Sequence, residues 1–426
     1  MFYFLSLRPI SNEKYGDGGL ILDIFSNPNL YKAMGGSFVL TSGLFSVLLL
    51  ISRSQNQLLK RLFYVPARKS KSNAIQLGGL ALGAGIYASL LFCKFFPEFF
   101  NVFNAKDIRL IEYFLIAGAL INLYGYLDDK IELRPIVKLM GQVSSVVLYA
   151  TLCSHLLSMH HNQIVFIIIC FWGLGVVNGS NLLDGLDTLT LKLGMVSYGT
   201  FMFLGAYHNS PKIVICSALF MSCLGAFYFF NREPAKIHLG EIGGSLVGFS
   251  TLLLSSFLWQ AVRADNFSPV RSGVLAIIPL TLPMVELGVS FLRRVYNKKS
   301  PFKGDQLHIH HILNREYGFT PSSVGTIMAL GYLITMAGTL YLQILTHPYL
   351  ALVALIVAQT GICFLIGKKY WNSEDTITIT PRSIINFLRK KDVTIIESGQ
   401  IDSFQLTILK EEIEKAEQEE DDSEAA

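Results

Sequence analysis

Charged residues are scarce in this sequence of 426 residues. Asp, Glu, Lys and Arg together make up 15% of it, whereas ordinary globular domains contain about 25%. Hydrophobic residues make up 51%, and many stand in long blocks such as residues 242–260. This composition excludes a disordered, fibrous or collagen-like chain. It predicts a protein that has lipid as the solvent for much of its surface.

Cysteine motifs and a strong net charge are also missing, and we expect no leader segment. The six cysteines lie in apolar blocks without metal-ligand spacing, which excludes a secreted disulfide-rich domain and a cysteine metal site. The net charge of +4 is small and no nucleic-acid-binding motif is present, so we expect no nucleic acid partner. The first 34 residues are mixed in polarity, and no signal peptide is expected.

Long apolar runs predict the fold class, because about 18 or more apolar residues suffice for a membrane-spanning helix. We expect an all-α polytopic membrane protein with about eleven transmembrane helices. The sixth is the weakest, since it opens with polar residues. The expected spans are residues 35–52, 77–96, 110–127, 136–157, 163–180, 188–206, 212–230, 242–260, 273–292, 323–345 and 348–367.

Lysine and arginine gather in the loops that follow odd-numbered spans. Residues 53–71 and 293–315 hold six each, whereas residues 158–162 and 346–347 hold none. The positive-inside rule makes the basic loops cytoplasmic, so the N-terminus is predicted outside and the C-terminus inside.

Three regions are expected along the chain. Residues 1–34 form an extracytoplasmic N-terminal segment, and residues 35–370 form the transmembrane domain. Residues 371–426 form a cytoplasmic tail, in which β-like stretches and a short helical stretch suggest a small α/β unit before an acidic, disordered end.

Five polar clusters stand at predicted cytoplasmic ends of the spans, where such side chains are costly unless they pair, reach water or bind a ligand. The first holds Arg68, Lys69 and Lys71 before a Gly-Gly helix start. It is typical of positive-inside flanking, or of an anion clamp. The second is the pair Asp128 and Asp129, whose mutual repulsion a cation would relieve. We expect one acid to face a ligand and the other to meet Lys138.

The third and fourth clusters combine oxygen ligands with helix ends. Asn178, Asn181 and Asp184 recur every three residues and share one helix face, ahead of Gly185 and Asp187. These amides and carboxylates suit magnesium, although helix capping explains one or two of them. In the fourth, residues 231–245 lead into a glycine-rich helix start that could hold phosphate. Its acid, Glu241, is equally a capping residue or a metal ligand.

The fifth cluster is a histidine group, His308, His310 and His311. Zinc binding is the weaker interpretation, because no cysteine or further histidine lies nearby with zinc-finger spacing. Donation of hydrogen bonds to phosphate is the stronger one, and a solvated loop stays open. Acids for a divalent cation, helix starts and basic groups on one membrane face are the parts that phosphoryl transfer needs. Membrane embedding suggests a lipid substrate, with a soluble phosphate donor entering from the cytoplasm.

Four segments together resemble a known family. YLDDKIELRPIVKLMGQ, VVNGSNLLDGLDTLT, NREPAKIHLGEIGGS and GDQLHIHHIL stand in the order found in the polyprenyl-phosphate N-acetylhexosamine-1-phosphate transferases of glycosyltransferase family 4. The chain resembles this family over about residues 40–320, most closely its WecA-like branch. The resemblance implies transfer of a sugar phosphate, GlcNAc-1-phosphate being the first expectation, from a UDP-linked amino sugar to undecaprenyl phosphate, with release of UMP.

The resemblance also implies a setting and a cofactor. The enzyme would lie in the bacterial inner (cytoplasmic) membrane with its active site facing the cytoplasm, and would start a cell-surface polysaccharide. Mg²⁺ is the implied cofactor, and Mn²⁺ could replace it. A homodimer is allowed but not implied.

Site roles follow from the same resemblance. The implied metal-associated positions are Asn181 and Glu241. The implied catalytic residues are Asp128, Asp129, Lys138, Asp184, His308, His310 and His311. The implied substrate-binding residues are Arg68, Lys69, Lys71, Asn178, Gly185, Asp187, Asn231 and His238. The chain departs from the family pattern at four positions: Glu241 replaces Asp, His238 replaces Phe, Thr188 replaces Gly, and Lys71 replaces His.

Two functions from other classes stay open. A transporter would place polar groups near the bilayer midplane, and the intramembrane acids Glu112 and Glu286 give it some support. A non-catalytic relative of the transferases is the other. The sequence decides neither the donor sugar nor whether transfer takes one step or two.

Overall fold

The computed structural model describes residues 25–65, 74–92, 102–156, 163–300 and 307–370. Several sequence predictions lie outside these residues. They concern the basic residues Arg68, Lys69 and Lys71, most of the N-terminal segment, and the tail from residue 371.

The described chain is helical, and its only β-type pairing is one bridge between Ile75 and Ile237. The helices are α3 Pro28–Arg53, α4 Gln57–Phe63, α5 Gly78–Phe92, α7 Ala105–Ile131, α8 Pro135–Leu156, α9 Gln163–Leu182, α10 Leu189–Tyr207, α11 Pro211–Asn231, α12 Gly240–Ala264, α13 Pro269–Ile277, α14 Thr281–Tyr296, α15 Ile309–Arg315, α16 Pro321–Leu345 and α17 Pro348–Gly367. Two short 3-10 helices, η2 Ile278–Leu280 and η3 Lys368–Tyr370, complete the series.

Each range predicted to span the membrane contains a helix. Nine segments within the described residues are long and apolar enough to cross a bilayer, including the weakly predicted α10. The helices α5, with 15 residues, and α9 are not among the nine. The all-α polytopic class is confirmed, whereas the count of eleven and the orientation of the termini stay predictions.

The ninth predicted span is not one continuous helix. The range 273–292 is divided into α13, the 3-10 turn η2 and α14. Pro279 lies in η2 and explains the break, because proline has no N–H for an α-helical hydrogen bond and its ring clashes with the preceding turn. The Pro279 carbonyl accepts a hydrogen bond from the Tyr332 hydroxyl of α16 at 2.5 Å, which satisfies a backbone group at the interruption.

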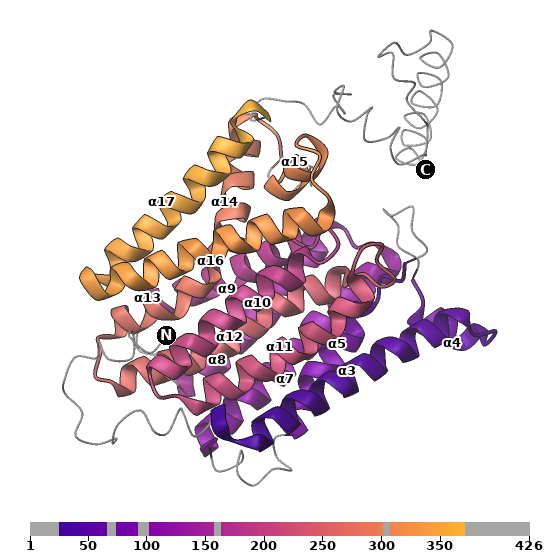
Figure 1. The fold of residues 1–426 in the computed structure, drawn as a ribbon, viewed down its shortest axis with the longest axis horizontal. Coiled ribbons are helices and arrows are strands. Elements are labelled where there is room, and N and C mark those ends of the chain that lie inside the picture. The colour runs from indigo at the N-terminus through magenta and orange to yellow at the C-terminus, as the bar shows by residue number, and fades with distance from the viewer. Residues whose placement is uncertain (1–24, 66–73, 93–101, 157–162, 301–306, 371–426) are drawn as a thin grey trace. The chain divides into compact units, whose positions relative to one another are not determined.

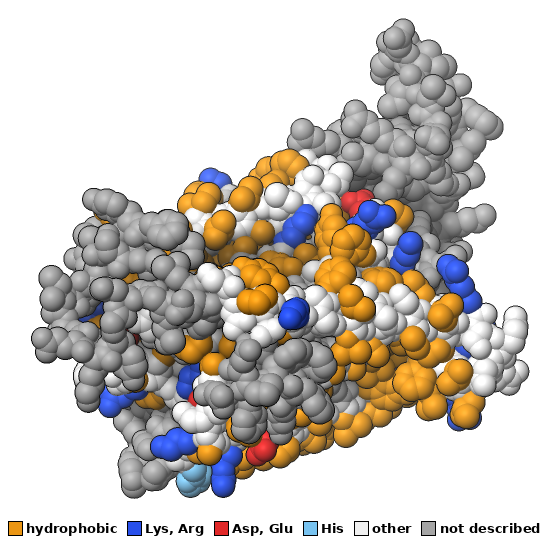
Figure 2. All heavy atoms as spheres, turned by 60° about the horizontal axis from the view of Figure 1, so that its bottom comes forward, with side chains coloured by type: hydrophobic (Ala, Val, Ile, Leu, Met, Phe, Trp, Pro, Cys, Tyr) orange, Lys and Arg blue, Asp and Glu red, His pale blue; other side chains and the backbone are white. Residues whose placement is uncertain are grey.

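Helix α12 is the centre of the bundle. It packs against α5, α7, α9, α10 and α11, and the long helices run side by side around it (Figure 1). Within its most apolar window 83% of residues are buried, against 22% for α3 and α17. Hydrophobic side chains cover a broad outer area (Figure 2), as expected of a surface that lipid surrounds.

Glycine lets the neighbours of α12 approach its first turns closely. A Cβ atom on Gly244 would lie 2.9 Å from the Asn181 Cα of α9, and one on Gly248 would lie 2.8 Å from the Val176 carbonyl oxygen. On α7, a Cβ atom on Gly125 would lie 2.8 Å from the Ile242 Cα. Small residues at such crossings allow close backbone approach in membrane bundles. The ends of α7 and α9 are thereby held against the start of α12.

The Gly125 contact predicts that alanine destabilises the protein at this glycine but not at another helical glycine, Gly43. Gly125→Ala should lower the free energy of unfolding by about 1–3 kcal/mol, because a methyl group would press on backbone atoms that cannot yield. Gly43→Ala in α3 is the matched control, since nothing lies within 4 Å of its Cβ position. Thermal unfolding in detergent, followed by tryptophan fluorescence, measures both variants. Equal melting temperatures would contradict the close crossing of α7 and α12.

Candidate active site

A tight turn between α7 and α8 folds one acid back toward a lysine. Glu132 ends α7 with φ of 53°, and Pro135 begins α8. The Leu133 backbone N–H donates to Asp128 Oδ1 at 2.7 Å. The other oxygen, Oδ2, lies 3.5 Å from Lys138 Nζ, one turn into α8. One acid, Asp128, meets Lys138 as predicted. The predicted division of roles is wrong, because Asp128 also lines the cavity of the site, whereas Asp129 contacts the start of α12.

The neighbouring acid, Asp129, caps α12. Its Oδ1 accepts from the Glu241 backbone N–H at 3.0 Å, and its Oδ2 accepts from the Ile242 N–H at 3.5 Å. Gln76 Nε2 donates to the same carboxylate at 3.4 Å. A carboxylate at this point satisfies unpaired helix donors and faces the positive end of the helix dipole. The two helix-start N–H groups that the sequence suggested for phosphate are therefore engaged by Asp129.

Glycine is required where α12 begins. Gly240 has φ of 68°, in the left-handed region that side chains disfavour. A Cβ atom there would also lie 2.6 Å from Asp129 Oδ2. The backbone at Gly240 thus allows Asp129 to reach the α12 amides and leaves the next side chain, Glu241, free to turn elsewhere.

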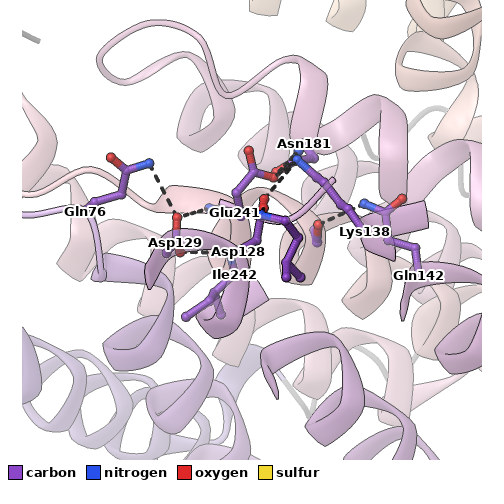
Figure 3. Close-up of polar contacts among 10 residues, drawn as sticks. Gln76, Asp128, Asp129, Lys138, Gln142, Asn181, Glu241 and Ile242 are labelled. Atoms are coloured by element: carbon purple, nitrogen blue, oxygen red, sulfur yellow. Dashed lines mark hydrogen bonds and ion pairs between the residues drawn. The ribbon is translucent and has the colours of Figure 1, made fainter. Parts of the chain in front are cut away.

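Glu241 joins side chains from two other helices (Figure 3). Its Oε2 accepts from Asn181 Nδ2 of α9 at 2.7 Å and forms an ion pair with Lys138 of α8. A small cavity lies beside this group and is lined by Asp128, Lys138 and Glu241. Gln142 and Ser245, which also line it, are joined by a hydrogen bond of 3.4 Å.

The oxygen ligands around this cavity suit a divalent cation. Asp128 and Glu241 already share one positive charge, the Lys138 ammonium group. Asn181 supplies a further side-chain oxygen at the same place if its amide rotates. Among the described residues no group of three His, Cys, Asp or Glu side chains is arranged to hold a metal ion. Mg²⁺ needs no such group, because it commonly binds one or two carboxylates and completes its shell with water and substrate phosphates.

Asp184 lies on the loop that follows α9, beside the start of α12. Its Oδ1 accepts from the Thr190 hydroxyl at 2.7 Å, and its Cβ lies 3.3 Å from the Cβ position of Gly244. Burial raises the pKa of Asp184 to about 8, and the Thr190 hydrogen bond only partly offsets that rise. Without a bound cation, Asp184 is therefore largely protonated at neutral pH.

Asn231 and Asp187 join two loops of the site. Asn231 Oδ1 accepts from the Thr188 N–H at 2.7 Å, and its Nδ2 donates to the Ile237 carbonyl at 2.9 Å. Asp187 Oδ2 accepts from the Ala235 N–H at 3.1 Å, and its Oδ1 lies 3.5 Å from His238 Nδ1. Burial lowers the pKa of His238, and the charge of Asp187 partly offsets this decrease. Asn231 thus has a structural role, and its predicted contact with substrate stays a prediction.

The histidine cluster lies against the loop that follows α9, at Gly185. A Cβ atom on Gly185 would be 2.5 Å from His310 Nε2, so only glycine allows this approach. His310 is fully buried, and burial, with His311 and His308 nearby, sets its pKa well below the ordinary value. It is therefore neutral at pH 7. The structure brings together the second to fifth polar clusters, as the sequence predicted, with Asn178 half-buried one turn before Asn181.

Comparison with known proteins shows which family part of this chain resembles. A family model described as glycosyl transferase family 4 matches residues 111–258, the range that carries Asp128, Asn181 and Glu241. Over these residues the chain is similar to glycosyl transferase family 4.

Proteins from three bacteria are similar to this chain over longer ranges. A Bacillus subtilis protein named probable undecaprenyl-phosphate N-acetylglucosaminyl 1-phosphate transferase is 25% identical over 69% of this chain and 82% of its own length. A Yersinia pestis protein named undecaprenyl-phosphate alpha-N-acetylglucosaminyl 1-phosphate transferase is 25% identical over 71% and 83%. The Mycobacterium leprae decaprenyl-phosphate N-acetylglucosaminephosphotransferase is 26% identical over 56% and 66%.

Several residues of the candidate site were not predicted. Gln142 and Ser245 line the cavity, Gln76 contacts Asp129, and Thr190 contacts Asp184. Helical spacing offered a signal for two of them. Gln142 follows Lys138 by four residues and Ser245 follows Glu241 by four, so each lies on the same helix face as a predicted residue.

The backbone conformation at Thr188 predicts that glycine at this position stabilises the protein. It is buried with φ of 65°, and its hydroxyl has no hydrogen-bond partner among the described residues. The left-handed region costs a side chain about 1–2 kcal/mol, and glycine loses about 0.5–1 kcal/mol more entropy on folding. Thr188→Gly should therefore stabilise the protein by about 1 kcal/mol in thermal unfolding. Asn266→Gly, at φ of 61°, is the control and should gain less, because asparagine tolerates this region. A destabilised Thr188→Gly would contradict strain at this position.

Asp184 predicts how stability depends on pH. The unfolded chain releases this proton near pH 4, whereas the folded protein holds it up to about pH 8. The folded state therefore binds more protons between these values, and Asp184 makes stability fall as pH rises through that window. Asp184→Asn should reduce the drop in melting temperature between pH 5 and pH 8, measured in EDTA. An unchanged drop would show that Asp184 ionises freely in the folded protein.

Proposed function

We propose that this protein transfers N-acetylhexosamine-1-phosphate, with GlcNAc-1-phosphate as the first candidate, from a UDP-sugar to undecaprenyl phosphate, releasing UMP. The observation that carries the proposal is the meeting of Asp128, Lys138 and Glu241, from three helices, at one cavity, with Asn181 of a fourth helix bonded to Glu241. The relatives support it, because each is named as a transferase of N-acetylglucosamine phosphate that acts on a polyprenyl phosphate. The product would start a cell-surface polysaccharide at the inner membrane of a bacterium.

The donor diphosphate would bind beside this cavity. Asn181 and Glu241, with Asp128 close by, would hold Mg²⁺, and Mn²⁺ could take its place. When bound, the ion would offset negative charge on the diphosphate and on the leaving UMP. Without a cation, Lys138 pairs with both acids. With a divalent cation present, its ammonium group is placed to contact a phosphate oxygen of the donor instead.

The acceptor needs little activation. The second pKa of a phosphate monoester is about 6, so the lipid phosphate is largely a dianion at pH 7. One of its oxygens would attack the phosphorus that carries the sugar, and the bond from that phosphorus to the bridging oxygen would break, leaving UMP. Asp128 would orient the acceptor or accept a late proton. A two-step route through an aspartyl intermediate is the alternative.

The remaining polar residues would surround the sugar and the nucleotide. Asp187 lies after α9 and His238 before α12, and the histidine cluster at the start of α15 contacts Gly185. Because His310 is neutral at pH 7, it would contribute a hydrogen bond rather than a charge. Buried hydrogen-bonding groups of this kind favour substrates that pair with them.

Transport is less well supported by the positions of the intramembrane acids. Glu112 is exposed on the surface of α7, and Glu286 faces His308 at 3.8 Å. Within the described residues these acids therefore mark no second polar path through the bundle.

A turnover assay tests the proposal. Purified protein in nanodiscs should release UMP from a UDP-amino sugar only when polyprenyl phosphate and Mg²⁺ are present, and EDTA should stop the reaction. Asp128→Asn and Glu241→Gln should each lower kcat/KM by roughly 100-fold or more, since charge stabilisation in a poorly solvated site is large. Glu112→Gln is the control and should turn over normally. No UMP with any donor would reject the proposed function.

Shortening the Glu241 side chain distinguishes direct metal binding from binding through a water molecule. Glu241 contacts both Asn181 and Lys138 directly. If it binds the ion directly, Glu241→Asp should lose most activity, because Mg²⁺ requires ligands at about 2.0–2.1 Å. Partial activity would instead indicate a bridging water. A Glu241→Gln variant with parental turnover would show that the Glu241 carboxylate only joins Asn181 and Lys138 and holds no metal.

A further inference from the structure

Glu286 is a buried acid that the site described so far does not use. It lies in α14 with 1% of its surface exposed. Its Oε1 has no hydrogen-bond partner among the described residues. Leaving a buried acceptor unsatisfied costs about 1–3 kcal/mol, and more if it is charged. Packing alone therefore gives no reason for a carboxylate here rather than an apolar side chain.

The other oxygen of Glu286 faces the histidine cluster. Oε2 lies 3.8 Å from His308 Nδ1. The same nitrogen is 2.9 Å from the hydroxyl of Ser290, one turn after Glu286 on α14. Ser290 and His308 are buried as well, with 2% and 5% exposed. One face of α14 thus presents a hydroxyl and a carboxylate to a single ring nitrogen.

The His308 ring is in turn stacked on the rest of the cluster. The rings of His308 and His310 are parallel within 3°, with centroids 5.6 Å apart. The rings of His310 and His311 lie 4.2 Å apart. His310 abuts Gly185, on the loop that carries Asp184 and Asp187. Continuous contact therefore runs from Glu286, inside α14, to the loop beside the proposed donor site.

We propose that Glu286 is a positioning residue for the proposed transferase reaction. Its carboxylate selects the His308 form that carries a proton on Nδ1, and with Ser290 it fixes the orientation of the ring. Through the stacked rings it sets His310 and His311 against the Asp184–Asp187 loop. A carboxylate behind a histidine nitrogen determines the tautomer and the ring orientation in many sites. The inference rests on the proposed function for its kinetic part, and on the His308 geometry alone for its spectroscopic part.

The spectroscopic test needs no turnover. Protein labelled with ¹⁵N-histidine is compared in nanodiscs as parent, Glu286→Gln and Glu112→Gln, with His308→Gln to assign the His308 signals. Glu286→Gln should shift the His308 ring nitrogen resonances, because the carboxylate that favours the proton on Nδ1 is gone. Glu112→Gln changes the other intramembrane acid, which is exposed on α7, and should leave them in place. Parental His308 signals in Glu286→Gln would overturn the proposal whether or not the protein is active.

The kinetic test separates positioning from simple packing. Glu286→Gln should lower kcat by roughly 10- to 100-fold, the usual effect of removing a residue that orients a functional histidine, while KM for the UDP-sugar changes little. Glu286→Asp should recover part of kcat. In a His308→Gln background, Glu286→Gln should cause little further loss, because the group it positions is absent. Additive losses, or a parental kcat in Glu286→Gln, would overturn the proposal.

Two outcomes keep the inference distinct from the proposed function. A parent protein that releases no UMP would reject the transferase proposal, while the ¹⁵N signals would still decide whether Glu286 controls His308. If Glu286→Gln does not fold, Glu286→Asp and Ser290→Ala replace it in both tests. Parental His308 signals in both of these variants would overturn the proposal.

Discussion

The hydrogen bonds from the start of α12 to Asp129 are the constraint on which the rest of the site depends. They join the end of α7 to the most buried helix of the bundle, and the left-handed Gly240 makes the approach possible. With Asp129 turned to the α12 amides, Asp128 is left facing the cavity. Glu241, the first residue after Gly240, then reaches α8 and α9. The pair of adjacent acids thus divides into one structural and one cavity-facing carboxylate.

Charge balance explains why the site can persist without substrate. Two carboxylates, Asp128 and Glu241, share the ammonium group of Lys138, so one negative charge of the two is balanced in a partly buried cavity. Breaking such an ion pair is costly unless another charge replaces the lost partner. In the proposed reaction the cation and the donor diphosphate arrive as opposite charges. Lys138 and the two acids can then each exchange partners without leaving a charge unpaired.

Much of the architecture could be predicted from hydrophobic runs, because a bilayer demands long helices and little else. The runs did not reveal the break at Pro279, where a short 3-10 turn keeps the chain continuous between α13 and α14. The polar clusters could also be predicted to converge, since each stands at a helix end and is too costly in lipid without a partner.

The partners within the site could not be predicted, because they depend on how helices cross. Whether Asp128 or Asp129 meets Lys138 is decided by the turn at Glu132 and by the closeness of α7 to α12. Asn231 carries the residue type of a ligand, yet its amide joins two loops. Glu286 suggested transport when it was considered alone in its span. Its contact with His308 joins residues from α14 and from the segment before α15, whose relative positions no local pattern reveals.

A structure of the protein with Mg²⁺ and a UDP-amino sugar, determined by cryo-electron microscopy in nanodiscs, would test the central claim most directly. The account predicts that the diphosphate lies beside the cavity between α7, α8 and α12. The metal should be bound by Glu241 and Asn181, and Lys138 should have moved from Glu241 to a phosphate oxygen. A donor bound elsewhere on the bundle, with the Lys138–Glu241 ion pair intact, would contradict it.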